Sequence, residues 1–171
     1  MQNIKKYAIP AAFVALLVFI DQWTKWLAIR HLAPLDAYSP ARDNVLVEGF
    51  LRLTFLQNHG MAFGLMEGAR WLFIALTVVV VAVLLYFYKT TPKDTIGRLC
   101  RIALLLLIGG ALGNFIDRLF RGGGVVDFIA FEFNFFPFVF NFADVFVVVG
   151  VFSLMPLTFF IKDEKKDAKK S

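Results

Sequence analysis

The residues of this chain that could do chemistry are a few charged and amide side chains at the ends of long apolar runs. Five of them are ionisable and lie inside or beside such a run: Asp21, Lys25, Asp117, Arg118 and Asp144. An ionisable side chain near the centre of a membrane-spanning helix costs about 2.5–3.5 kcal/mol on insertion scales, so it persists mainly where it has a function. These five residues are the first candidates for a functional site.

The spacing of these residues places them on shared helix faces. Asp21 and Lys25 are four positions apart with the acid first, which is the favourable order for an ion pair on a helix. Asn114, Asp117 and Arg118 repeat the i, i+3, i+4 pattern farther along the chain. This spacing fits an ion pair that holds a helix end as well as it fits contact with a substrate, and both interpretations stay open.

Asp127 and Asp144 could form a different kind of site. Asp127 follows three glycines and two valines, so it lies on a loop or a returning strand, while Asp144 lies at the start of an apolar run. The helix dipole stabilises a carboxylate in the first turn, which alone would explain Asp144. If the fold brings the two carboxylates together, one holds a proton and the other can activate a water for attack on a carbonyl. The sequence alone does not show that they meet.

Other catalytic and metal-binding patterns have little support in the sequence. His31 and His59 lack the spacing of a zinc site, and no glycine-rich phosphate loop opens a helix after a strand. A dyad of Ser39 with Lys25 stays open without a supporting motif. The single Cys100 excludes an intrachain disulfide and is interpreted as an inert thiol at a helix end. We therefore expect neither a metal nor a cofactor.

The elements that must position these residues are membrane helices. Of the 171 residues, 59% are apolar and 18% are charged, whereas soluble domains are about 45–50% apolar. The charges are clustered between long uncharged runs, such as Trp71 to Tyr88. A spanning helix needs about 20 mainly apolar residues, and the composition excludes a disordered or coiled-coil chain. The predicted spans are residues 7–29, 70–89, 99–118 and 140–161.

The distribution of Lys and Arg predicts the orientation of these spans. With four spans both termini lie on one side, which carries eleven Lys and Arg residues against six on the other side. Because positive residues favour the cytoplasmic side, we expect both termini in the cytoplasm. The lysine-rich tail at 162–171 is then a contact for anionic lipids rather than for nucleic acid. The two loops at 30–69 and 119–139 lie on the outer face.

The two outer loops carry the rest of the predicted structure. Val45–Gln57, punctuated by Gly49, predicts one or two short strands and a turn. Eight phenylalanines lie between Phe128 and Phe142, and such a cluster is typical of the headgroup level of a membrane. The predicted fold class is an all-α integral membrane protein, with four transmembrane helices and a small extracytoplasmic β-rich element, in a single membrane domain over residues 1–171.

Five sequence blocks, taken together and in order, resemble the lipoprotein signal peptidases, also called signal peptidase II, of the bacterial cytoplasmic membrane. The resemblance covers about residues 10 to 161. The blocks are Asp21-Gln-Trp-Thr-Lys25, Asn58-His-Gly60-Met-Ala62-Phe63-Gly64, Gly109-Gly110-Ala-Leu-Gly113-Asn114-Phe-Ile-Asp117-Arg118, Val125-Val126-Asp127-Phe128-Ile129 and Phe140-Asn141-Phe-Ala143-Asp144.

The resemblance implies an aspartic endopeptidase with its active site near the outer face of the bacterial inner membrane. Such an enzyme removes signal peptides from diacylglyceryl-modified prolipoproteins and cleaves before the lipid-modified cysteine. The catalytic carboxylates of the family fall on Asp127 and Asp144. Its substrate-binding and supporting residues fall on Asn58, Asn114, Arg118, Asn141, Gly110, Asp21, Lys25 and Asp117.

The resemblance also predicts the partners, which are a lipid-modified prolipoprotein and membrane lipids, with no nucleic acid and with the chain as a monomer. One departure from the family is Met61, where Ala is common, and its flexible thioether would alter the contact of the outer loop with a ligand.

The alternatives are a passive assembly protein and a small ion channel or proton-coupled transporter that uses Asp21, Asp117 and Asp144. A transporter would need polar residues along the full depth of the bundle, and the inner halves of the second to fourth spans have none.

Overall fold

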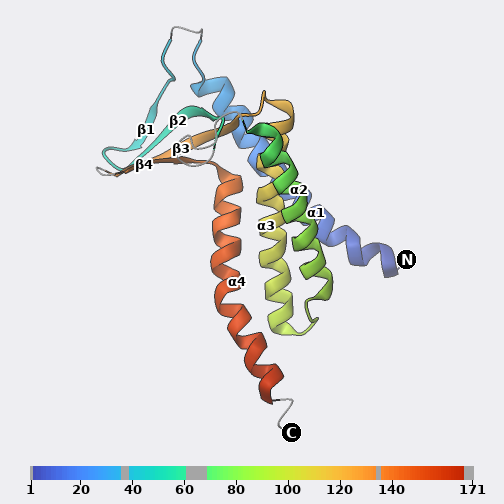
Figure 1. The fold of residues 1–171 in the computed structure, drawn as a ribbon. Helices are drawn as coiled ribbons and strands as arrows, with labels where there is room; N and C mark the ends of the chain where they lie inside the picture. Colours follow the sequence, from blue (N-terminus) through green and yellow to red (C-terminus); the bar gives the residue numbers. More distant parts are fainter. Residues whose placement is uncertain (1, 36–38, 61–68, 134–135, 168–171) are drawn as a thin grey trace.

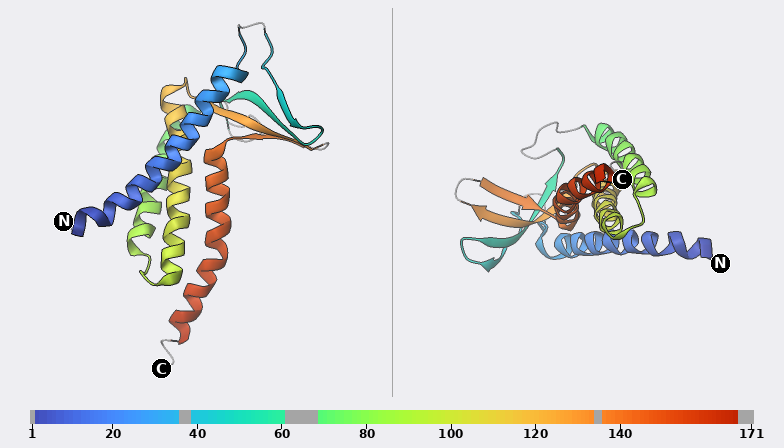
Figure 2. Two further views of the ribbon diagram at one scale, coloured as in Figure 1. Left: turned by 180° about the vertical axis from the view of Figure 1, so that it is seen from behind. Right: turned by 90° about the horizontal axis from the view of Figure 1, so that it is seen from below.

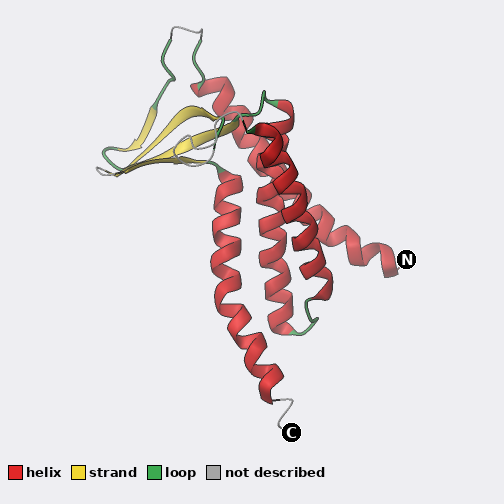
Figure 3. Cartoon of the chain, in the orientation of Figure 1, coloured by secondary structure: helices red, strands yellow, loops and turns green. Residues whose placement is uncertain are grey.

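The computed structural model describes residues 2–35, 39–60, 69–133 and 136–167 and combines a bundle of long helices with a small sheet at one end (Figures 1 and 3). The sheet projects sideways from the bundle, and the C-terminus lies at the opposite end. In chain order the elements are α1 Gln2–Leu32, β1 Asn44–Val47, β2 Leu51–Asn58, α2 Arg70–Thr90, α3 Thr95–Phe120, β3 Val125–Phe133, β4 Phe136–Phe140 and α4 Phe142–Asp167.

Each predicted span overlaps one helix of the structure. Within α1 the segment Tyr7–Leu32, and the whole of α2 and α3, are long and apolar enough to cross a membrane. In the described part of α4 the apolar stretch Phe142–Leu157 is shorter than a full span, so a fourth crossing stays a prediction. Helix α1 continues three residues beyond the predicted end at residue 29, and α4 begins two residues after the predicted start at residue 140.

A short connection between α2 and α3 makes these two helices antiparallel neighbours. Asp94 is the N-cap of α3, and its Oδ1 accepts a hydrogen bond of 2.7 Å from the Gly97 amide. Such a cap satisfies one of the backbone N–H groups that have no partner inside the helix. Helix α3 packs against α1, α2 and α4 and forms the centre of the bundle (Figure 2).

The predicted β-rich element is a four-stranded antiparallel sheet with strand order β1-β2-β3-β4. The expectation of one or two strands in the first outer loop is confirmed by β1 and β2, which are joined through a turn with Gly49 at φ 68°. Asp127 lies on β3, opposite Leu56 of β2, with a register shift between Leu53 and Leu56. The sequence had left open whether Asp127 belongs to a loop or to a strand, and the structure assigns it to the strand.

Three glycines of α3 allow the neighbouring helices to approach closely. A Cβ added at Gly109 would lie 2.7 Å from Leu17 Cδ1 of α1, and one at Gly110 would overlap the Ala143 carbonyl oxygen at the start of α4. At Gly113 an added Cβ would lie 2.6 Å from Asp21 Oδ2. These glycines therefore allow close packing, and Gly110 in particular lies directly against the first turn of α4.

We predict that Gly110→Val displaces the start of α4. The new side chain would meet the Ala143 carbonyl and the Val147 side chain, and overpacking of this kind costs about 1–3 kcal/mol. Thermal unfolding in detergent should therefore occur at a lower temperature than in the unmodified protein. The control is Ala111→Val, one residue along the same helix, which introduces the same β-branched residue at a partly exposed position. Equal melting temperatures for the two variants would contradict the packing argument.

Candidate active site

A fully buried lysine organises the polar residues at the sheet end of the bundle. The Nζ atom of Lys25 lies 2.9 Å from Asp21 Oδ2, 2.9 Å from Asp117 Oδ2 and 2.9 Å from Asn114 Oδ1. The side chains of Lys25, Asp21 and Asp117 are all 0% exposed. An ammonium group has three donors, and each has an acceptor here. A second cation, Arg121, contacts Asp117 Oδ1 at 3.3 Å, so the buried charges are balanced.

The two carboxylates of this cluster also bind backbone amides of other elements. Asp117 Oδ2 accepts a hydrogen bond of 3.1 Å from the Val126 amide of β3. Asp21 Oδ1 accepts one of 2.9 Å from the Ala143 amide in the first turn of α4. Val126 and Ala143 are the residues immediately before Asp127 and Asp144. The lysine cluster therefore positions the backbone just before each of the two candidate catalytic carboxylates.

Asp144 closes the N-terminus of α4 together with Asn141. The Asp144 amide donates to Asn141 Oδ1 at 3.0 Å, and the Asn141 amide donates to Asp144 Oδ2 at 3.2 Å. This reciprocal pair is a capping box with an aspartate in the third helical position. The predicted placement of Asp144 in the first turn is confirmed. Its other oxygen, Oδ1, accepts a hydrogen bond of 2.8 Å from Asn114 Nδ2.

Asp127, on strand β3 of the sheet, also contacts Asn141. Its Oδ1 accepts a hydrogen bond of 2.6 Å from Asn141 Nδ2, and its Oδ2 accepts one of 3.1 Å from Asn58 Nδ2 on β2. Asn141 thus donates to the Asp127 carboxylate from its side-chain amide and to the Asp144 carboxylate from its backbone amide. The fold brings together two carboxylates that the sequence separates by 17 positions, and the residues that join them are asparagines.

The position of Asp127 alters its proton affinity. The side chain is buried, which disfavours the charged form, and the negative charge of Asp144 adds to this effect. The hydrogen bonds from Asn58 and Asn141 stabilise the carboxylate and offset part of the change. Together these effects raise the pKa of Asp127 from 3.8 to about 7. Near neutral pH this carboxyl group can therefore hold and release a proton.

Arg118 and Gly110 border this site from α3. The Arg118 guanidinium lies 4.8 Å from the centre of the Phe73 ring on α2, and its Nη2 is 3.4 Å from the Gly60 carbonyl oxygen. Its Nε atom is buried and has no hydrogen-bond partner among the described residues. Gly110 lies against Ala143, directly before Asp144. Residues 61–68 follow Gly60 and include Met61, which lies outside the described residues.

Gln22 and Arg121 also contribute to this polar cluster, and neither was among the site residues expected from the sequence. Gln22 Nε2 donates to Asp117 Oδ1 at 2.9 Å and to the Gly113 carbonyl at 3.1 Å. Gln22 Oε1 accepts from Arg121 Nη2 at 3.0 Å. The available signals were the place of Gln22 between Asp21 and Lys25 and the four-residue spacing from Asp117 to Arg121. A glutamine between two charged residues gives no signal of its own in the sequence. Its role becomes visible only through partners that are more than 90 positions away.

The contacts of Lys25 and the placement of potential metal ligands bear on the other chemistries considered for the sequence. All three donors of Lys25 are occupied, so Lys25 has no capacity to serve Ser39 in a dyad. In the part of the chain that the structure describes, no three His, Cys, Asp or Glu side chains are grouped as for a metal ion. Cys100 is buried in α3 as a free thiol.

The chain is similar to known proteins over nearly its whole length. The family model described as signal peptidase (SPase) II matches residues 13–160. The lipoprotein signal peptidase of Caldanaerobacter subterraneus subsp. tengcongensis is 44% identical over 147 residues, which is 86% of this chain and 93% of that protein. The lipoprotein signal peptidase of Halalkalibacterium halodurans is 43% identical over 156 residues, covering 90% of this chain and 92% of that protein.

The fold is similar to that of a solved bacterial membrane enzyme. That structure, determined by the in meso method at 2.3 Å resolution, superposes with a TM-score of 0.75 at 28% sequence identity. The match covers 93% of this chain and 91% of the other. A second bacterial membrane enzyme structure, at 1.9 Å resolution, has a TM-score of 0.72 at 29% identity and covers 86% of this chain and 90% of the other.

We predict that Asp21→Ala destabilises the protein by about 3–5 kcal/mol, because removal of one carboxylate from the buried cluster leaves it with an excess of positive charge. The substitution also removes the acceptor of the Ala143 amide. Thermal unfolding in detergent should show this loss, while some cleavage activity remains.

The control for this prediction is Asp43→Ala. Asp43 pairs with Arg52 at 3.0 Å, but both side chains are more than one-third exposed, and exposed pairs contribute about 0–1 kcal/mol. A melting temperature for Asp21→Ala equal to that of the control, combined with complete loss of cleavage, would show that Asp21 acts on the substrate rather than on the fold.

Proposed function

The chain belongs to the signal peptidase II family, and on that premise we propose that Asp127 and Asp144 act together as the catalytic pair of an aspartic endopeptidase. The protein is a bacterial membrane protease that removes signal peptides from prolipoproteins. The proposed substrate is a prolipoprotein whose cysteine carries a diacylglyceryl group, and the bond cleaved is the one before that cysteine. The observation that carries the proposal is the contact of Asn141 with both carboxylates.

The raised pKa of Asp127 supports an assignment of roles within the pair. Asp127 holds the proton and Asp144 is ionised, with a water between them. Asp144 accepts a proton from this water as its oxygen attacks the carbonyl carbon of the scissile bond. Asp127 donates its proton to the carbonyl oxygen. The result is a neutral tetrahedral intermediate with two hydroxyl groups.

The second half of the reaction restores both carboxyl groups. Asp144 passes its proton to the nitrogen of the leaving cysteine residue, and the carbon–nitrogen bond breaks. One hydroxyl group of the intermediate returns a proton to Asp127 as the new carboxylic acid forms. Each carboxyl group thus serves once as acid and once as base, and water is the only co-reactant.

The surrounding asparagines are proposed to support the two carboxylates, and Arg118 is proposed to bind the substrate. Asn58 and Asn114 each donate to one carboxylate, and these bonds limit the rotation of Asp127 and Asp144. The buried Arg118 Nε has no partner among the described residues, so it can donate to a backbone carbonyl of the bound peptide. Binding and chemistry then depend on different side chains, which makes them separable by mutation.

The alternative of a channel or proton-coupled transporter is not supported. Among the described residues, the buried charged side chains of the bundle lie together at its sheet end, where Lys25 contacts both Asp21 and Asp117 at 2.9 Å. A transport pathway would need such groups along the full depth of the bundle. Their concentration at one level favours a site for a substrate that lies at the membrane surface.

We predict that Asp127→Asn and Asp144→Asn each lower the cleavage rate by roughly 10²–10⁴-fold, the contribution typical of a positioned acid or base. The double variant should be little worse than either single variant, because members of one catalytic unit are not additive. The measurement is a gel-shift assay on a diacylglyceryl-modified prolipoprotein, and a chelator should leave the rate unchanged.

Two controls accompany this prediction. An asparagine at residue 127 places an amide nitrogen opposite the donor of Asn58 or Asn141, so thermal unfolding must show that each variant folds. Binding of a lipopeptide that resembles the substrate should persist in both. Substantial activity in either folded variant would contradict the aspartic mechanism, as would a loss of activity on chelation that added metal restores.

The rate of cleavage should depend on pH with two limbs. As the pH rises through about 7, Asp127 loses the proton that it must donate, so kcat/KM falls on the alkaline side. On the acid side kcat/KM falls because the pair takes up a second proton, so that no carboxylate remains to accept one from water. The two limbs belong to the pair rather than to either residue. A rate that keeps rising well above neutral pH would overturn the assignment of Asp127 as the acid.

We also propose four spans with both termini in the cytoplasm, since eleven Lys and Arg residues gather on that side against six on the other. Reporter fusions after Lys93 and after Ser171 should give a cytoplasmic signal, whereas a fusion near Asp43 should give an outer signal. The site then faces the outer leaflet, where a lipid-modified substrate lies. A cytoplasmic signal from the fusion near Asp43 would reverse this orientation.

A further inference from the structure

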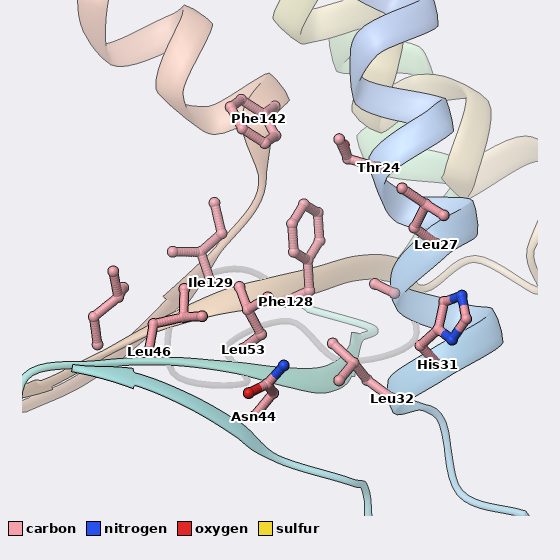
Figure 4. A pocket seen from close by; sticks show the side chains of 12 residues that line it. Thr24, Leu27, His31, Leu32, Asn44, Leu46, Leu53, Phe128, Ile129 and Phe142 are labelled. Carbon is pink, nitrogen blue, oxygen red and sulfur yellow. The ribbon is translucent and has the colours of Figure 1, made fainter. Parts of the chain in front are cut away.

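A cavity of about 490 Å³ lies between the end of α1, the start of α4 and the sheet. Figure 4 shows residues from the three parts around it, with Phe142 of α4 on one side, Leu27 of α1 on another and Phe128 rising from the sheet between them. The volume falls within the range of small-molecule sites, about 300–1,000 Å³. The principal apolar lining residues are Leu27, Leu32, Leu46, Leu53, Phe128 and Phe142.

The lining of the cavity matches a ligand that is apolar over most of its length. The polar lining residues are Thr24, His31 and Asn44. The Thr24 hydroxyl donates to the Ile20 carbonyl at 2.8 Å, so it does not require a ligand. His31 and Asn44 lie at the end of α1 and the start of β1. A fatty acyl chain beneath them, with a polar group near His31, fits this distribution.

The position of the cavity along α1 indicates where such a chain comes from. Phe19, Trp23 and Trp26 form an exposed stack on α1, with ring centres 5.9 and 5.1 Å apart, and the Arg30 guanidinium lies 5.3 Å from the Trp26 ring. Exposed tryptophan and arginine near the end of an apolar helix mark the headgroup level of a membrane. The cavity beside the same helical turns therefore borders the bilayer at that level.

The cavity is open to the surface but separate from the carboxylates. Two lining residues, Leu27 and Leu46, are 36% and 53% exposed, so a lipid chain can reach it. None of its described lining residues belongs to the candidate active site. However, Phe128 follows Asp127 directly and Phe142 follows Asn141. A chain in the cavity would pack against the two segments that carry the site.

We propose that this cavity binds one acyl chain of an outer-leaflet phospholipid, which fills the space between α1, α4 and the sheet and supports β3 and the first turn of α4. An acyl chain seated against the apolar lining would remove apolar surface from water and add dispersion contacts to the lining residues. The occupant is a bilayer lipid rather than the substrate because no described lining residue is shared with the carboxylate site. The proposal rests on the location in the membrane but not on the aspartic mechanism, so either can fail alone.

The first test measures the thermal stability of delipidated protein in detergent before and after addition of phosphatidylglycerol. The unmodified protein should gain about 5–10 °C at lipid levels well above the dissociation constant. Leu46→Trp and Leu27→Trp place an indole in the cavity and should gain much less. Leu85→Trp is the matched control, since Leu85 is 43% exposed on α2, and it should gain as much as the unmodified protein. Equal gains in all four proteins would overturn the proposal.

The second test identifies the occupant by photo-crosslinking with phosphatidylglycerol that carries a diazirine on its acyl chain. Labelling of Leu27 and Leu46 should exceed labelling of Leu85, and Leu46→Trp should reduce the label on Leu27. A peptide with a diacylglyceryl-modified cysteine should not compete. Labelling equal to that of Leu85 would overturn the proposal in favour of general bilayer contact, and competition by the peptide would overturn it in favour of a substrate subsite.

Discussion

The buried ammonium group of Lys25 is the interaction on which the rest of this structure depends. A buried charge is costly unless it is paired and hydrogen-bonded, and Lys25 meets this condition with Asp21, Asp117 and Asn114. These partners come from α1 and α3, so the pairing fixes the two helices to each other. It also orients the Asn114 amide, because an oxygen that accepts from Lys25 leaves the nitrogen to donate to Asp144.

Hydrogen bonds from backbone amides connect this cluster to the sheet and to α4. Asp117 binds the amide before Asp127, and Asp21 binds the amide before Asp144. The backbone before each candidate catalytic residue is thus fixed by a hydrogen bond to a buried carboxylate. Such support matters because catalytic groups must keep their geometry within a fraction of an ångström. A bundle held only by apolar contacts would not specify the rotation of β3 against α4.

Asn141 joins the folding of α4 to the chemistry. As an N-cap it receives the Asp144 amide, and its own side-chain amide donates to Asp127. The same residue therefore starts the helix and brings the carboxylates together. Burial of Asp127 and the nearby negative charge of Asp144 destabilise the ionised form of Asp127, which raises its pKa. For the same reason Asp127 can hold a proton near neutral pH.

The sequence by itself determined the helices, the strands of the first outer loop and the list of polar residues, because these depend on local composition, whereas it left open whether Asp127 lies on a loop or on a strand. Uncharged runs specify apolar helices, and the glycines at 109, 110 and 113 specify close packing. The five sequence blocks were enough to indicate the family. The sequence did not determine which polar residues touch, the role of Gln22 or the cavity beside α1. Contacts such as Asp21 with Ala143, 122 positions apart, depend on how α1, α3, β3 and α4 pack, and only the tertiary structure decided that packing.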